Sequence, residues 1–262
     1  RDGVRLSCRD WGGSGGGPPV VLLHGLAGHA GEWDDLAQVL SPRHRVVAVD
    51  QRGQGASERH PRDVSRAAYV ADVVAVGDQL GLHRPVLVGQ SLGGHTAMLT
   101  AAAHPDLVRA LFLVEAGAGG PSPDIQANIG AWLDGWPTPF PSRSAAAEFF
   151  GGGPHGEGWA AGLEQRDDGW WPRFDRDVMV ASMAELARRS FWGEWSGVTC
   201  PTLAVFGRRS FISPQEIDEM FRARPELRAV SVPDAGHDVH LDHPAALRRL
   251  VRHFLDEAVG DG

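Results

Sequence analysis

The stretch V-L-V-G-Q-S-L-G-G-H, residues 86–95, contains the pattern Gly-x-Ser-x-Gly between an apolar strand-like run and an apolar helix-like run. A nucleophile elbow needs this context, because its serine occupies a sharp turn between a strand and a helix. Gly89 and Gly93 leave no side chains to crowd Ser91. A helix that begins at Leu92 also directs free backbone N–H groups toward the same place. The stretch predicts that Ser91 is a nucleophile, the alternative being an ordinary turn serine.

Around this stretch, short apolar, β-branched runs alternate with longer helical patterns, as in the βαβ units of a parallel sheet. Strands are predicted at 20–24, 45–50, 86–89, 108–115, 202–207 and 227–232, with an antiparallel edge strand at 4–10. Helices are predicted at 32–40, 65–80, 92–103, 214–223 and 244–258. The pattern therefore predicts an α/β fold with a mostly parallel sheet that is flanked by helices.

The alternation of strands and helices stops between about residues 117 and 198. This segment is rich in Gly, Pro and Trp, shows no convincing strand, and is too long for an ordinary connection. Seven of the nine tryptophans lie in it. We expect residues 118–197 to form an inserted helical cap and residues 1–117 and 198–262 to form the core domain.

Composition limits the classes of partner. The 262 residues carry a formal net charge of −8 and no cluster of basic residues, so nucleic acid is not an expected partner. No apolar run approaches the roughly 20 residues of a membrane-spanning helix, so no membrane is expected either.

The two cysteines, Cys8 and Cys200, lack the spacing of a zinc site, and no metal is expected. Without a secretory signal at the start we expect a cytoplasmic location. All 25 basic residues are arginine, which is typical of a GC-rich bacterial genome.

Three further motifs accompany the elbow: H-G-L at 24–26, D-Q-R-G-Q-G-A-S at 50–57 and A-G-H-D-V-H at 235–240. With them, the chain resembles the α/β-hydrolase superfamily over nearly its whole length outside the cap. The resemblance implies a mostly parallel, eight-stranded sheet with the cap inserted after strand 6. It also implies an oxyanion hole made by the backbone N–H groups of Leu26 and Leu92, which would stabilise charge in a tetrahedral intermediate. Asp50 and Arg52 match a motif that braces loops.

The resemblance places the general base at His237, in a Gly-His loop between the last strand and the closing helix. His237 would accept the proton of Ser91 and pass it to the leaving group. His240 and His243 are the nearby alternatives, and we expect them to serve packing and capping instead.

The acid of such a triad is missing from the family's usual position, because the strand 202–207 is followed by Arg208, Arg209 and Ser210. The preceding strand ends in Glu115 at the same carboxyl edge of the sheet. Since neighbouring strands lie about 4.8 Å apart, a longer side chain can absorb the displacement.

Three assignments of the acid therefore stay open. We expect Glu115 to orient His237, while Asp234 or Asp238 beside the histidine, or no acid at all, are the alternatives. If Glu115 is the acid, replacing Ser210 by alanine is expected to change little.

Large aromatic side chains are concentrated in the predicted cap. Some of them would form the cap's own core, and others would line a mostly apolar substrate pocket. The residues predicted for this pocket are His24, Trp132, Trp136, Trp170, Trp171 and Trp192.

Taken together, the motifs predict a serine hydrolase that cleaves a carboxylic ester or lactone through an acyl-enzyme, with a Ser-His-Glu triad. No cofactor is expected, and the expected partner is a small apolar ester or lactone; the oligomeric state is not predicted. Two alternatives remain, because fold and triad do not determine the reaction. One is a cofactor-free lyase, oxygenase or acyltransferase of the same fold, and the other is a ligand-binding sensor with little turnover.

Overall fold

The computed structural model describes residues 3–13 and 15–260. Its main feature is a seven-stranded sheet in the order β1-β3-β2-β4-β5-β8-β9. The edge strand β1 is antiparallel to β3, and the remaining neighbours are parallel, which confirms the predicted α/β fold. The strands are β1 (Ser7–Asp10), β2 (Val20–Leu23), β3 (Val46–Asp50), β4 (Val86–Gln90), β5 (Ala110–Val114), β8 (Thr202–Gly207) and β9 (Arg228–Val232).

The five central strands, β2, β3, β4, β5 and β8, are buried along their whole length. Strands covered on both faces read as continuous apolar runs, which is why the sequence pattern located them well. Successive side chains still alternate between the faces. Leu87 packs in one hydrophobic layer, whereas Val86 and Val88 pack in the other.

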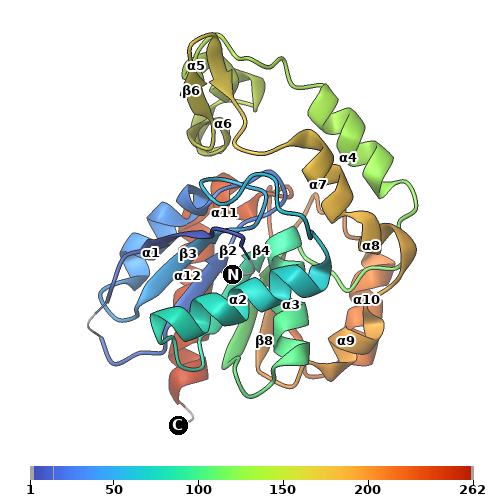
Figure 1. The fold of residues 1–262 in the computed structure, drawn as a ribbon. Coiled ribbons are helices and arrows are strands. Elements are labelled where there is room, and N and C mark those ends of the chain that lie inside the picture. Colours follow the sequence, from blue (N-terminus) through green and yellow to red (C-terminus); the bar gives the residue numbers. More distant parts are fainter. Residues whose placement is uncertain (1–2, 14, 261–262) are drawn as a thin grey trace.

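Helices cover both faces of the sheet (Figure 1). One layer is formed by α1 (Asp34–Leu40), the short turn η1 (Ala30–Trp33) and α12 (Pro244–Gly260). The other is formed by α2 (Arg66–Leu80), α3 (Leu92–Ala103), α9 (Trp192–Gly197) and α10 (Pro214–Ala223). The bounds of α3 and α10 are those predicted, while α1 begins later because η1 precedes it.

The chain between β5 and β8 carries the elements that the sequence assigns to a cap. They are α4 (Ile125–Asp134), α5 (Arg143–Phe149), α6 (Gly153–Ala161), β6 (Glu164–Arg166), β7 (Gly169–Trp171), α7 (Arg176–Ser182) and α8 (Ala184–Arg188). In Figure 1, α5, α6 and β6 form a lobe above the sheet, with α4 and α7 beside it. Two details differ from the expectation: β6 and β7 form a small antiparallel sheet, and α9 packs against α3 in the core.

The expected count of eight strands is wrong for the described residues, which form a main sheet of seven. Among the described residues before Val20, only Ser7–Asp10 forms a strand. Residues 12–19 consist of Gly, Ser and Pro, which are poorly suited to strands. Ser14, within this stretch, and residues 1–2 and 261–262, at the ends of the predicted core domain, lie outside the described residues.

A buried ion pair joins the loop after β3 to α2. Arg52 donates from Nε to Asp72 Oδ2 at 2.6 Å and from Nη2 to Asp72 Oδ1 at 2.5 Å, and its Nη1 donates to the carbonyl of Asp63. The two charged side chains are only 2% and 6% exposed. These contacts agree with the bracing role expected of Arg52.

Within the described residues, no helix is long and apolar enough to cross a bilayer.

We predict that Arg52→Met lowers the free energy of unfolding by roughly 3–5 kcal/mol, because it leaves the Asp72 carboxylate buried without its cation. The matched control is Arg9→Met, which removes an exposed pair with Asp34 and should cost less than about 1 kcal/mol. Urea denaturation measures both. Equal losses in the two variants would contradict the bracing role of Arg52.

Candidate active site

Ser91 occupies a strained turn between β4 and α3. Its backbone has φ 50° and ψ −118°, a conformation that non-glycine residues rarely adopt and that costs about 1–3 kcal/mol. The flanking glycines make the turn possible. A Cβ on Gly89 would lie 2.5 Å from the carbonyl oxygen of Gly93, and a Cβ on Gly93 would lie 2.3 Å from that of Leu23. Glycine at both positions therefore permits the tight turn that places the Ser91 side chain at the carboxyl edge of the sheet.

A cavity of about 460 Å³ opens at this edge, and Ser91 and His237 both line it. Its wall is mainly apolar. The apolar lining residues are Leu26, Leu92, Ile125, Ile129, Trp132, Trp159, Met183 and Phe211, and the other polar side chains are those of Glu32, Gln90 and Asp238. The core thus supplies the reactive groups, and the segment between β5 and β8 supplies much of the apolar wall.

The two predicted oxyanion donors, Leu26 and Leu92, both lie in the wall of this cavity. Leu92 is the first residue of α3, and the first N–H groups of a helix have no acceptor within it. Leu26 lies in the loop after β2. That loop is held by a bond of 2.6 Å from the N–H of Ala27 to Gln54 Oε1.

His24 lies beneath this loop and does not line the cavity, which corrects its predicted place in the substrate pocket. Its Nε2 accepts from the N–H of Gln51 at 3.0 Å, so Nδ1 carries the proton and donates to the carbonyl of Gly25 at 2.7 Å. Burial lowers the pKa of His24, which favours this neutral form. Both ring nitrogens are used to fasten the loop, and none is left for a substrate.

His237 and Glu115 are brought together at the same edge. The distance from His237 Nδ1 to Glu115 Oε2 is 3.4 Å. The Glu115 side chain is fully buried, whereas that of His237 is 30% exposed. With Nδ1 directed at the carboxylate, Nε2 is the ring nitrogen available to exchange a proton with Ser91. This is the arrangement that orients a general base.

The other carboxylates that the sequence offered are engaged elsewhere. Asp238 accepts from Gln90 Nε2 at 3.2 Å and from Trp159 Nε1 at 3.0 Å. Asp234 is exposed, in the turn after β9, with φ 61°. Among the described residues, the carboxylate in contact with the His237 ring is therefore that of Glu115.

The two alternative histidines serve the scaffold. His240, on the short helix α11 (Val239–Asp242), lies 3.0 Å from Glu32 through Nε2 and stacks on Trp33 at 4.9 Å. His243 follows α11 as its C-terminal cap residue. Both positions agree with the packing and capping roles expected of them.

Ser210, at the family's usual position for the acid, contacts the Glu115 carboxylate. Its Oγ donates to Glu115 Oε2 at 2.8 Å and accepts from the N–H of Ile212 at 3.0 Å. The accepted bond turns the hydroxyl hydrogen toward the carboxylate. The N–H of Gly207 donates to the other oxygen, Oε1, at 2.6 Å. The sequence led us to expect little effect of replacing Ser210, whereas these contacts favour a positioning role for its hydroxyl, which the Ser210→Ala variant tests.

Of the predicted pocket tryptophans, only Trp132 lines the cavity beside Ser91. Trp136 and Trp171 line a second cavity of about 400 Å³, and Trp170 pairs through its backbone with Phe140. Trp192 packs against the hydrophobic layer around α3. These four placements correct the prediction. Trp136 and Trp170 pack in the cluster that gives the lobe its own core, whereas Trp192 packs against the main hydrophobic core.

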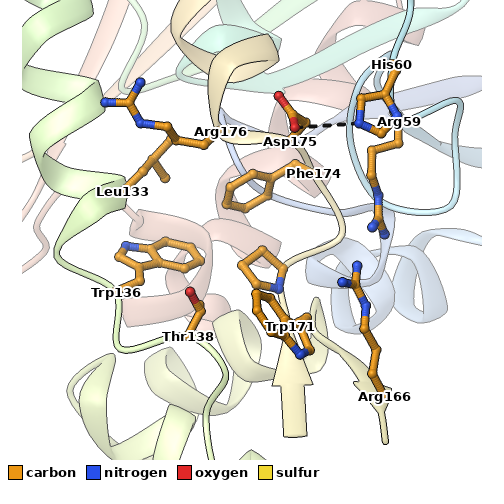
Figure 2. Close-up of a pocket in the computed structure, with 11 residues that line it drawn as sticks. Arg59, His60, Leu133, Trp136, Thr138, Arg166, Trp171, Phe174, Asp175 and Arg176 are labelled. Carbon is orange, nitrogen blue, oxygen red and sulfur yellow. Dashed lines mark ion pairs between the residues drawn. The ribbon is translucent and has the colours of Figure 1, made fainter. Parts of the chain in front are cut away.

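The second cavity lies between α4, the β6–β7 sheet and the loop that carries Arg59 and His60 (Figure 2). Its charged groups are already paired. Arg59 and Arg166 both contact Glu164, and His60 lies 3.5 Å from Asp175. The charged side chains of this cavity are thus held in ion pairs, and within the described residues no cluster of three metal-ligating side chains occurs.

Sequence reasoning did not single out Phe211 or Met183 as pocket residues, and it named Trp159 only among the aromatic residues of the cap, some of which were expected to line the pocket. Phe211 is 69% exposed and lies against the His237 ring, with ring centroids 4.2 Å apart. Its position just after β8 is a usable signal, because the carboxyl end of that strand faces the site. For Trp159 and Met183 no signal distinguishes them from neighbouring apolar residues of the same segment.

Comparison with known families agrees with this geometry. The family model for the alpha/beta hydrolase fold matches residues 18–244. The chain belongs to this family. The match includes the elbow, the loop after β2 and His237.

Several relatives of known name are hydrolases. The chain is 30% identical to the sn-1-specific diacylglycerol lipase of Mus musculus, over 91% of this chain and 81% of that protein. It is 28% identical to the 2-(acetamidomethylene)succinate hydrolase of Mesorhizobium japonicum, over 97% and 92%. A crystal structure of E-2-(acetamidomethylene)succinate hydrolase superposes with a TM-score of 0.87 at 25% identity, covering 97% of this chain and 96% of that one. These relatives indicate that this member of the family is a hydrolase.

We predict that Glu115→Gln lowers kcat/KM for an activated ester by roughly 10²–10⁴, because a neutral amide neither holds the tautomer of His237 nor stabilises the imidazolium. The control is Asp234→Asn, which removes an exposed carboxylate from the loop that carries His237 and should leave kcat/KM near that of the wild type. Near wild-type turnover in Glu115→Gln would mean that this carboxylate is not the acid.

We predict a smaller effect for Ser210→Ala, a loss of about tenfold in kcat/KM, because hydrogen bonds to charged groups contribute about 1.5–3 kcal/mol. Without this donor the Glu115 carboxylate stabilises the imidazolium more strongly. The acid limb of the pH–rate profile should therefore move to higher pH. Ser196→Ala, on the exposed side of α9, is the control, and an unshifted limb in Ser210→Ala would refute the positioning role.

Proposed function

We propose that the protein is a serine hydrolase that cleaves a carboxylic ester or lactone through an acyl-enzyme, with Ser91, His237 and Glu115 as its triad. One observation carries the proposal. Ser91, on its strained turn, shares a cavity with His237, whose Nδ1 lies 3.4 Å from the buried Glu115 carboxylate. A nucleophile, its base and the group that orients the base thus occupy one edge of the sheet.

The reaction follows from these positions. His237 takes the proton from Ser91 Oγ as this oxygen attacks the carbonyl carbon, and the carbonyl oxygen becomes an oxyanion. The N–H groups of Leu26 and Leu92 stabilise that oxyanion. The intermediate collapses to an acyl-Ser91 ester, and His237 gives its proton to the departing alkoxide. Water, deprotonated by His237, then releases the acid and restores Ser91.

The shape of the cavity supports a small, mostly apolar substrate. Its volume of about 460 Å³ lies within the usual range for small-molecule sites. The relatives' names refer to different substrates, a diacylglycerol in one and a succinate derivative in another. The substrate class therefore rests on the cavity of this chain, with Ile129, Trp132 and Met183 as apolar surface beside Ser91.

Residues 118–197 act in this proposal as a cap that shapes the substrate site. Four of the apolar lining residues belong to α4 and α6, and Met183 follows α7. The cap is also fastened to the core beside the site, since His29 Nε2 donates to the carbonyl of Gly158 at 3.0 Å. The core would supply the chemistry, and the cap would supply the walls that choose the substrate.

The test is active-site labelling with a fluorophosphonate. We predict a covalent adduct on the peptide that contains Ser91 and on no other serine, because only an activated serine displaces fluoride from the probe. Ser91→Ala should lose both the label and the turnover of p-nitrophenyl esters. Ser196→Ala should keep both. Folded protein that remains unlabelled would overturn the proposed function.

A further inference from the structure

The cavity beside Ser91 has an uneven distribution of charge. Two carboxylates, those of Glu32 and Asp238, lie in its wall, and its only other titratable side chain, among the described residues, is that of His237. No arginine lines it, and the sequence contains no lysine. A substrate in this cavity therefore meets two carboxylates and no permanent cation.

The Asp238 carboxylate is held by uncharged donors, the amide of Gln90 and the indole of Trp159. His155 is the nearest ionisable partner, with Nε2 3.8 Å from Asp238 Oδ2. Its Nδ1, however, lies 2.8 Å from Asp242. One imidazole thus faces two carboxylates, and even a protonated His155 leaves this group with a negative charge.

The charge of Glu32 is at most neutralised. Burial would raise its pKa, but the hydrogen bond with His240 lowers it, and Glu32 is ionised. Neither of the other two histidines adds a cation: His24 is neutral by burial, and His29 accepts a backbone hydrogen bond at Nδ1 while it donates at Nε2. Only His240 can offset Glu32.

Carboxylates also outnumber the imidazoles that contact them when the surroundings of the cavity are included. The carboxylates at or directly behind the cavity are those of Glu32, Glu115, Asp238 and Asp242, and the imidazoles that contact them are those of His155, His237 and His240. Four negative groups face three that can become positive. Even with these three imidazoles protonated, the four carboxylates leave a net negative charge, and a mostly apolar cavity screens its field weakly.

We propose that this field selects the substrate by charge, with Asp238 as the specificity-determining residue. The group that enters the cavity is uncharged or carries an ammonium, and esters that bear a carboxylate or phosphate near the reacting carbonyl are rejected. The inference rests on the proposed function, because it concerns the substrate of the same nucleophile. It adds to the proposed function the sign of charge that the cavity excludes. The apolar lining by itself does not determine that sign.

Three p-nitrophenyl esters of similar length test the sign. They are the uncharged hexanoate, the anionic monoester of adipate and the cationic ε-aminocaproate. Desolvation penalises both charged esters, so the ratio of kcat/KM for the cation to that for the anion isolates the sign of the field. We expect the hexanoate to react fastest and the cation to exceed the anion by about tenfold or more.

Asp238→Asn should reduce this ratio by at least about threefold, and any general loss of turnover cancels in it. The control is Asp256→Asn, which removes the same charge from α12, where Asp256 pairs with Arg43, and should leave the ratio unchanged. An anion hydrolysed as fast as the cation by the wild type, or a ratio unaltered in Asp238→Asn, would overturn the inference while the proposed function stands. No turnover of the hexanoate and no labelling of Ser91 would overturn both.

Discussion

The active site depends on the way two adjacent buried strands end. β4 and β5 are paired in register up to Gln90 and Val114, and each is followed by a residue in the left-handed region, Ser91 and Glu115, both with φ 50°. Such backbone is costly outside glycine and persists only when the surroundings hold it. Here the next strand holds it in both cases, since Ser91 N–H donates to Val114 and Glu115 N–H donates to Val205, each at 2.9 Å. The sheet therefore aims both side chains at one place.

In the proposed triad the acid follows β5 and not β8, which changes what the end of β8 must provide. In the family's usual arrangement this position holds an acceptor, whereas here it supplies donors, the N–H of Gly207 and the hydroxyl of Ser210, to the Glu115 carboxylate. A buried carboxylate needs such donors, because without them its desolvation would be uncompensated. Ser210 is thus the counterpart of the relocated acid, which the absence of an aspartate in the sequence does not reveal by itself.

The sequence was most informative where one physical requirement acts alone. Continuous apolar runs located the central strands, and the close backbone approaches at Gly89 and Gly93 explain why the elbow can be recognised. It was least informative between β5 and β8, where apolar residues serve either the core of the lobe or the cavity. Trp159 and Trp171 are both tryptophans of the segment between β5 and β8, yet of these two only Trp159 lines the cavity beside Ser91. That choice depends on how the lobe docks, which no local pattern records.

One residue connects the segment between β5 and β8 with the charge of the candidate site. Trp159, on α6, donates to Asp238, and Asp238 directly follows His237 in the chain. The indole satisfies a carboxylate oxygen without neutralising it, whereas an arginine at the same place would have made an ion pair. Because Gln90, the residue before Ser91, is the second donor, the position of Asp238 is set jointly by the turn between β4 and α3 and by α6. The Trp159 indole thereby holds the histidine loop without neutralising Asp238. In the proposed selection by charge, the same hydrogen bond attaches α6 to the core and preserves the negative field.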